Sequence, residues 1–247
     1  MHKFRKAGLF ALAATLGLAI ASGASAATAS SRPSWTGVWT HVGSINFDPT
    51  IPGSRTDDPP YNAEYKKKWE EILAAEKEGR AINDKSADCH PPGIVRMMNM
   101  AYPTEFLETP GQLTIINEWM GQTRRIYTDG RPHPEYPDPS YNGHSIGHWE
   151  GDTLIVDTVA VLGEGIINDH GAPLGKQVHV KERIWAEDPD TLKVEFTVES
   201  PDALLRPITA TKTLKRRKGM EILEYVCVQN NRNPTNADGT TGIVLTK

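Results

Sequence analysis

Cysteine is scarce in this sequence, and long apolar runs are confined to its first residues. The 247-residue chain has two cysteines, Cys89 and Cys227. Cys89-His90 lacks the second cysteine that haem attachment needs, and no paired C-x-x-C, H-x-H or H-E-x-x-H pattern is present for zinc. A Walker loop is also missing. We therefore expect no cofactor and no metal, although a metal site assembled across strands stays open.

The N-terminus has the three parts of a secretory signal peptide. A basic segment, 1–6, is followed by an apolar run that reaches about Ser22, and Ala24-Ser25-Ala26 forms an A-x-A cleavage site. The apolar run is short for a membrane anchor, and no second long run follows it. We expect cleavage after residue 26, a periplasmic or secreted location, and no stable membrane insertion of the mature chain.

The charge of the mature chain argues against nucleic-acid binding. The precursor has 27 basic and 31 acidic residues, and three of the basic residues, Lys3, Arg5 and Lys6, leave with the signal peptide. The resulting net charge of −7 repels phosphate backbones. Residues 27–247 have a length that suits one large all-β domain or two small ones, and we expect a single domain. The oligomeric state leaves no visible trace in the sequence.

The two cysteines of an exported protein invite a disulfide bond. An even pair in an oxidising compartment is typical of such a bond, and this one would connect an early loop to the last predicted strand. The alternative is two separate buried thiols.

The predicted fold is mainly β, with one N-terminal amphipathic helix. The helix begins at Asp58-Pro59 and ends at Gly79, inside a helix and loop insertion at about 44–103. Strands separated by tight turns are predicted at 35–40, 104–109, 112–119, 123–128, 144–150, 153–160, 176–187, 191–199, 208–217 and 220–228. Consecutive hairpins without intervening helices favour an antiparallel up-and-down β-barrel.

The start of the first strand adds a resemblance to a known class of barrels. Gly37-Val38-Trp39 resembles the G-x-W opening of lipocalin-like, or calycin-type, barrels. That resemblance implies that Trp39 closes one end of the barrel and that a basic residue such as Arg232 packs on it. The stretches TDGRPHP and GHSIGHWEGDTLIVDT, at 128–134 and 143–158, resemble an uncharacterised family of exported bacterial proteins, which implies no function.

One carboxylate is predicted to point into the barrel. Strand 191–199 alternates apolar and polar residues, so its apolar side is taken as the inner face. A three-residue turn at 188–190 then places Glu182 opposite Phe196, on that inner face. An inward carboxylate needs a partner or a raised pKa, so Glu182 is either paired with Lys212 or Arg124 or acts as a functional acid.

A second candidate site is a hairpin that collects two histidines and a carboxylate. A two-residue turn at Gly151-Asp152 places His144 and His148 on the same face as Asp157, which is diagonal to both at roughly 5–8 Å. A carboxylate that orients an imidazole makes a general base. The alternative is a hydrogen-bonded polar patch at the barrel mouth.

The loop before this hairpin could hold a ligand. Segment 129–143 contains four prolines and is therefore stiff. Its cationic, imidazole and phenolic side chains would suit a small anionic or aromatic ligand, or the loop could be purely structural. The predicted substrate-binding set is Arg131, His133, Tyr136, Tyr141 and Arg124. His179 is predicted to point outward as solvated surface.

Gly143-x-Ser145-x-Gly147 matches the nucleophile elbow of serine hydrolases. That mechanism needs a strand before the serine and a helix after it, whereas here a proline-rich loop precedes and another strand follows. Ser145 is also predicted to face away from Asp157, so this hypothesis ranks last.

Three functions follow from these patterns. The first is an exported, cofactor-independent lyase, isomerase or hydratase that uses general acid–base chemistry in a barrel pocket. In it, His144, His148, Asp157 and Glu182 would be catalytic. The second is a periplasmic carrier of an apolar or aromatic ligand, in which the polar residues only orient the ligand. The third is the Ser145 hydrolase.

Overall fold

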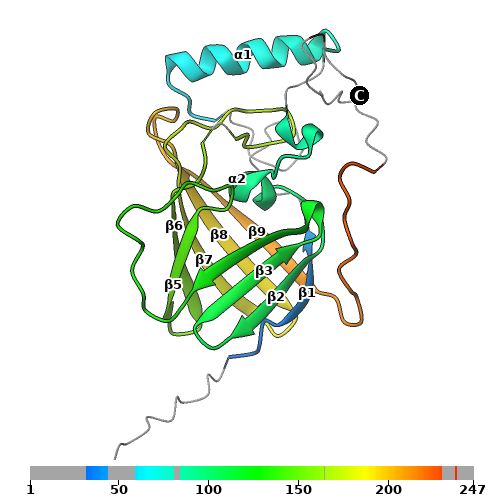
Figure 1. Cartoon of the computed structure of the whole chain (residues 1–247), viewed down its shortest axis with the longest axis vertical. Helices are drawn as coiled ribbons and strands as arrows, with labels where there is room; N and C mark the ends of the chain where they lie inside the picture. Colours follow the sequence, from blue (N-terminus) through cyan, green and yellow to red (C-terminus); the bar gives the residue numbers. More distant parts are fainter. Residues whose placement is uncertain (1–31, 44–58, 81–83, 164, 230–236, 238–247) are drawn as a thin grey trace, which may run out of the picture. The chain divides into compact units, whose positions relative to one another are not determined.

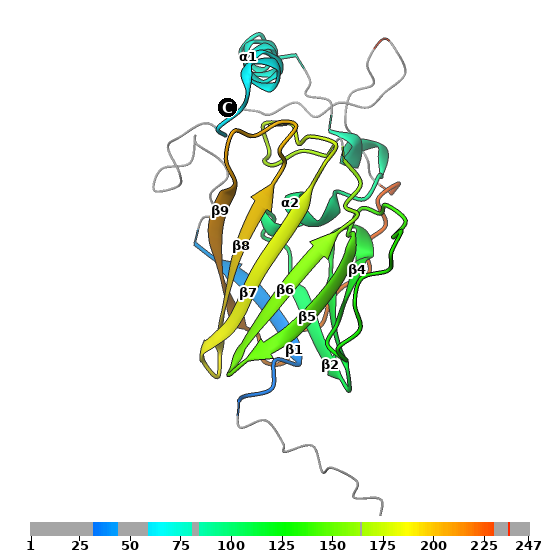
Figure 2. The same ribbon diagram turned by 90° about the vertical axis from the view of Figure 1, so that its left-hand side faces the viewer.

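The computed structural model describes residues 32–43, 59–80, 84–163, 165–229 and 237, so the predicted signal peptide lies outside the described residues. In this part, nine strands close into a barrel in sequence order (Figures 1 and 2). The strands are β1 (Gly37–Val42), β2 (Thr104–Thr109), β3 (Gln112–Asn117), β4 (Gln122–Tyr127), β5 (His144–Glu150), β6 (Thr153–Val159), β7 (His179–Asp188), β8 (Thr191–Glu199) and β9 (Ile208–Arg216). The mainly β prediction is confirmed.

The barrel is mixed rather than purely antiparallel, which corrects the up-and-down prediction. β4 and β5 are parallel, with Ile126 paired to Ser145 and Tyr127 paired to Ile146. The other neighbouring strands of the described barrel pair antiparallel. Parallel neighbours need a long connection, and the proline-rich segment 128–143 supplies it in place of a tight turn.

The predicted strand at 220–228 does not form. β9 already pairs with β1, for example through His41 and Leu214, so the barrel is closed without a further strand. Segment 220–228 runs outside the barrel as an irregular chain, with Leu223 and Val228 exposed (Figure 1). Its apolar residues mimic a strand, but no sheet edge remains to receive them.

Helices occur at more places than predicted. α1 spans Ala63–Lys77 and is capped by Asn62, whose side chain accepts a hydrogen bond from the Tyr65 amide. The cap predicted at Asp58 lies outside the described residues. The short helices are η1 (Lys85–Asp88), α2 (Gly93–Met98) and η2 (Trp119–Gly121). With six residues, α2 is too short to show a helical period in the sequence.

The first strand closes one end of the barrel through a stacked tryptophan. Trp39 is buried, and the guanidinium carbon of Arg216 lies 4.2 Å from the centre of its ring. Arg216 also donates hydrogen bonds to the carbonyl oxygens of Thr36 at 2.7 Å and Ser34 at 2.6 Å. The basic residue that packs on Trp39 is therefore Arg216 of β9, the strand that pairs with β1. Arg232 lies outside the described residues.

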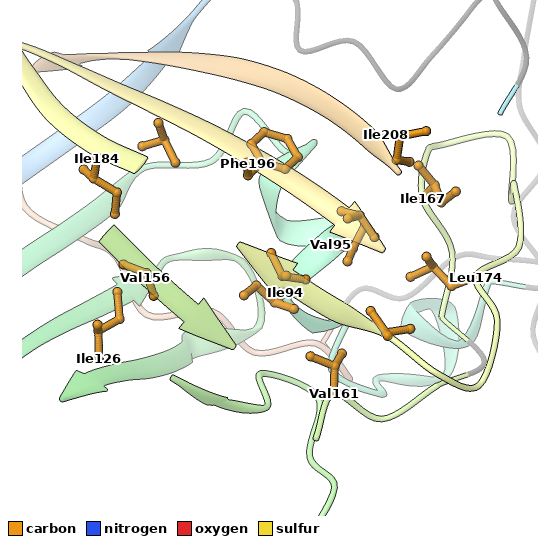
Figure 3. Close-up of a cluster of buried hydrophobic side chains, with 14 of the residues drawn as sticks. Ile94, Val95, Ile126, Val156, Val161, Ile167, Leu174, Ile184, Phe196 and Ile208 are labelled. Carbon is orange, nitrogen blue, oxygen red and sulfur yellow. The ribbon is translucent and has the colours of Figure 1, made fainter. Parts of the chain in front are cut away.

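At the other end, α2 inserts apolar side chains among those of the barrel. Figure 3 shows its Ile94 and Val95 in the same buried cluster as Val156 and Phe196. Cys89, just after η1, and Cys227 form the predicted disulfide, with their Cα atoms 5.7 Å apart. Cys227 lies in the irregular chain after β9 rather than in a strand. None of the described helices is long and apolar enough to cross a membrane.

Candidate functional site

The predicted inward carboxylate is the centre of a buried ion pair. Glu182 pairs with Phe196 across β7 and β8, as expected, and it is buried. Arg124 of β4 reaches it with both terminal nitrogens, one of them at 3.0 Å from Oε1. The same guanidinium donates to Thr158 Oγ1 at 2.9 Å and to Ser145 Oγ at 3.1 Å. Of the two partners predicted for Glu182, the structure therefore selects Arg124.

Ser145 takes part in this network and is not arranged as a nucleophile. Its hydroxyl is buried, and its partners among the described residues are Arg124 and Thr158, at 3.1 and 2.9 Å, so no histidine of the described chain activates it. The glycines of the motif have packing reasons instead. A Cβ on Gly143 would lie 2.6 Å from the Val159 carbonyl oxygen, and one on Gly147 would lie 3.0 Å from Leu154. The G-x-S-x-G pattern therefore reflects close strand packing.

Lys212, the other partner considered for Glu182, forms no ion pair with a carboxylate of the described residues. It lies on β9, is 5% exposed, and donates one hydrogen bond, to the Met100 carbonyl oxygen at 3.0 Å. Burial lowers the pKa of Lys212 to about 8. Its side chain lines a cavity of about 70 Å³ inside the barrel, beside Gln122, Arg124 and Glu182. The polar residues Thr104, Asn117 and Asn142 and apolar residues of α2 and of the barrel complete the wall.

A larger pocket lies beside the N-terminal part of α2, which contributes Gly93, Ile94 and Val95 to its lining. Its volume is about 670 Å³, and it is lined by α1, by segment 84–95 and by segment 161–176. Ile94 of α2 lines both this mouth pocket and the interior cavity. The mouth pocket wall combines apolar and aromatic side chains with the lysines Lys68, Lys85 and Lys176. A pocket of this size at a barrel mouth suits a small organic ligand.

The histidine and aspartate hairpin has the predicted register but faces outward. His144 pairs with Val159 and Ile146 with Asp157, so His144 and Asp157 do share a face. The inner face of β6 is formed instead by the buried residues Leu154, Val156 and Thr158. The expectation that His144 and Asp157 line a barrel pocket together with Glu182 does not agree with this placement. The barrel wall separates the two groups.

On the outer wall, Asp157 is held between two histidines. His133 Nε2 lies 2.9 Å from Asp157 Oδ2, and His179 Nε2 lies 2.7 Å from Oδ1. His133 also contacts His144 through their Nδ1 atoms at 2.7 Å, and His179 contacts Glu199 at 3.1 Å. His179 is thus outward, as predicted, but it belongs to this network rather than to bare solvated surface.

The network alters two ionisation equilibria. Burial by itself would raise the pKa of Asp157, but hydrogen bonds from His179 and His133 hold that pKa below its usual range. Burial, helped by the nearby His133 and Arg131, lowers the pKa of His144. Neutral His144 can then share one proton with His133 between the two Nδ1 atoms. The arrangement secures the loop 128–143 to the barrel wall through His133.

The remaining predicted site residues are dispersed. His148 is exposed beside Glu150, and Arg131 pairs with Asp129 and stacks on Tyr127. Tyr136 is 85% exposed. Tyr141 hydrogen-bonds His90 at 3.1 Å and lines the mouth pocket. Of the predicted substrate-binding set, Arg124 lines the interior cavity and Tyr141 lines the mouth pocket, and the other three line neither of these two.

Several pocket residues escaped the sequence interpretation. Met97 and Met98 line the interior cavity, and both belong to the undetected helix α2. The mouth pocket is formed largely by loops, whose conformation leaves no periodic pattern. In the described part of the chain, no group of three or more His, Cys, Asp or Glu side chains is placed to hold a metal ion.

Comparison with known proteins finds no matching family model and no matching curated protein. Solved structures give distant similarities. Two variants of the fluorescent protein UnaG share 15% and 16% identity, with TM-scores of 0.36 and 0.35, over 74% of this chain and 95% and 96% of theirs. A fatty acid transporter, REP1-NXSQ, shares 14% identity and a TM-score of 0.34, over 75% of this chain and 97% of its own. These similarities are too distant to carry an argument about function.

Proposed function

We propose that this protein is an exported carrier that binds a small organic molecule in the mouth pocket. The observation that carries the proposal is the pocket of about 670 Å³ between α1, α2 and segment 161–176. Ligand sites are commonly 300–1,000 Å³ in volume and occur in the mouths of β-barrels. Export is supported by the signal peptide predicted at 1–26 and by the disulfide, which is typical of oxidising compartments.

The lining indicates the chemistry of the ligand. Tyr65, Ile72 and Leu174 supply an aromatic and aliphatic wall for an apolar body. Among the described lining residues, the acidic one is Asp84, which is buried, accepts a hydrogen bond from the Ser86 amide at 2.9 Å and lies 4.0 Å from Arg96. The lining also includes Lys68, Lys85 and Lys176, of which Lys68 pairs with Glu64 at 2.6 Å. An aromatic or aliphatic molecule with an acidic group fits this wall best.

The carrier is favoured over the acid–base enzyme because the candidate catalytic groups do not meet in a pocket. Glu182 is inside the barrel and fully engaged by Arg124, whereas Asp157 and His144 are on the outer wall. A general acid and base must both reach the same bound substrate. The mouth pocket itself is lined by neither Glu182 nor Asp157.

Filling the mouth pocket tests the proposal. A Cβ on Gly165 would sit 3.5 Å from Leu174, another lining residue, so Gly165→Phe places a ring in the pocket at little steric cost. The probe is 8-anilinonaphthalene-1-sulfonate, an aromatic anion whose fluorescence rises on binding. We expect Gly165→Phe to weaken its binding by roughly tenfold or more.

The matched control puts the same ring outside the pocket. Lys67 is exposed on α1 and does not line the pocket, so Lys67→Phe should bind the probe as the unmodified protein does. The proposal fails if the unmodified protein gives no saturable fluorescence signal, or if Gly165→Phe and Lys67→Phe bind equally well.

A further inference from the structure

Two buried polar groups line the interior cavity, and the described residues supply neither a counter-charge for the first nor a hydrogen-bond donor for the second. Lys212 is 5% exposed, and its ammonium makes one hydrogen bond, to a backbone carbonyl oxygen. Among the described residues, no carboxylate lies within ion-pair distance of Lys212. Glu182, which lines the same cavity, is paired with Arg124. Gln122, which lines the same cavity, has a buried Oε1 atom without a hydrogen-bond partner.

Asn117, Arg124 and Glu182, which line the same cavity, have hydrogen-bond partners, and Asn142 donates to the Thr123 carbonyl oxygen at 3.2 Å. Asn117 donates to Thr104 Oγ1 at 2.9 Å and accepts from the Trp119 amide at 2.9 Å. The Arg124 guanidinium balances the charge of Glu182. The cavity therefore has an unbalanced positive charge at Lys212 and an unused acceptor at Gln122.

Such groups destabilise a fold unless something else compensates for them. An isolated buried charge and an unsatisfied buried acceptor each cost free energy, and proteins seldom retain them without a partner. Water could satisfy the Gln122 acceptor, but it would leave the charge of Lys212 unbalanced. An anion that also carries a hydrogen-bond donor would satisfy both groups together.

We propose that the interior cavity is a binding site for a short hydroxycarboxylic acid, whose carboxylate pairs with Lys212 and whose hydroxyl donates to Gln122. The cavity of about 70 Å³ sets the size. One water-sized group needs roughly 10–15 Å³ on this measure, so the ligand has about six non-hydrogen atoms, as lactate does. Phe106, Ile115 and Leu214 supply apolar wall for its methyl group.

This site goes beyond the proposed carrier function and does not depend on it. The mouth pocket and the interior cavity are lined by different sets of residues, with Ile94 of α2 shared by both. The flexible side chains of Met97 and Met98 line the interior cavity on the α2 side, where a small ligand could pass. Failure of one site would therefore not count against the other.

Calorimetric titration of the purified protein with three matched compounds tests the inference. Sodium lactate has both the carboxylate and the hydroxyl, propionate lacks the hydroxyl, and lactamide lacks the charge. We expect lactate to bind, and propionate and lactamide each to bind roughly tenfold more weakly or worse. Gly165→Phe, which fills the mouth pocket, should leave lactate binding unchanged.

Two substitutions assign the contacts. Lys212→Met should abolish lactate binding, and it should fold because it replaces a buried ammonium by an apolar chain of similar length. Gln122→Leu should bind lactate and propionate equally. Lys215→Met is the control, since Lys215 lies on the same strand but is exposed.

Three results would overturn the inference. These are lactate binding that survives Lys212→Met, equal affinity of the unmodified protein for lactate and lactamide, and no heat of binding for either carboxylate. The last result would mean that the cavity holds only water.

Discussion

At the scale of single residues, buried charge takes two forms in this barrel. Arg124 and Glu182 form a bidentate pair whose remaining hydrogen bonds go to Ser145 and Thr158. Lys212 has no such partner. A satisfied pair of this kind contributes little net stability, but removing one partner leaves the other charged and buried. The pair therefore holds the neighbouring strands in a defined arrangement, whereas Lys212 is available to a ligand.

The Arg124–Glu182 pair can be tested by comparing single and double substitutions. Glu182→Gln should lower the free energy of unfolding by about 3–5 kcal/mol, because Arg124 loses its buried counter-charge. Replacing both residues by apolar ones, as Arg124→Met with Glu182→Leu, should recover most of that loss. Urea denaturation at neutral pH measures both effects.

Glu195→Gln serves as the control for this comparison, because Glu195 lies on the outer face, opposite Arg183 in the pairing of β7 with β8. We expect it to change the stability by about 0.5 kcal/mol or less. If Glu182→Gln lowers the free energy of unfolding no more than Glu195→Gln does, the Arg124–Glu182 pair is not needed for stability.

At the scale of elements, the loop 128–143 depends on its attachment to the outer wall. This loop makes the parallel β4–β5 connection possible, and His133 fixes it to Asp157 and His144. The network also links β6 to β7 through His179. The sequence suggests that these histidines and Asp157 form a general base. Their attachment of the loop to the barrel wall is a structural reason for the same cluster.

Asp157→Asn tests the attachment and gives it a pH signature. The folded state lowers the pKa of Asp157, so its ionised form stabilises the protein above the unfolded-state pKa of about 4. That stabilisation is lost as the pH falls below 4 and the carboxylate protonates. Since the side chain is 39% exposed, we expect Asp157→Asn to cost about 1 kcal/mol or less at pH 7.

The difference between Asp157→Asn and the unmodified protein should shrink below pH 4, measured by urea denaturation at pH 7 and pH 3. Asp152→Asn, in the exposed turn between β5 and β6, should show no comparable pH dependence. A deficit of Asp157→Asn that is equally large at both pH values would contradict an electrostatic attachment.

At the scale of the whole molecule, the disulfide connects two segments that lie outside the strands of the barrel. Cys89 ends the short helix η1, and Cys227 lies in the irregular chain after β9. The bond closes a loop with a sequence separation of 138 residues. Closing such a loop restricts the unfolded chain, and it keeps the segment after β9 beside the elements that line the mouth pocket.

Replacing both cysteines by serine should lower the free energy of unfolding by about 3–5 kcal/mol. Limited proteolysis should then cleave the segment 217–229 faster, whereas the barrel strands stay protected. Adding a reductant to the unmodified protein should reproduce the effect, and adding it to the double serine variant should change nothing. Unchanged stability on reduction would show that the bond is not needed for the fold.

Local patterns in the sequence predict much of this molecule. Strands 144–150 and 191–199 have the predicted bounds, because a two-residue turn and clean alternation define them. The inward position of Glu182 follows from the same alternation. The strand wrongly predicted at 220–228 has strand-like residues, and only the closure of β9 on β1 removes its partner.

The sequence by itself therefore determined most of the strands, the registers of the hairpins that contain Asp157 and Glu182, and the inward carboxylate, because these depend on neighbours along the chain. Tertiary structure decided which face of β6 points inward, since Ile155 and Val159 make its outer face apolar as well. It also decided that Arg124, not Lys212, neutralises Glu182, and that residues of α2 line two cavities. Those outcomes depend on contacts between distant segments, and only the closed barrel brings those segments together.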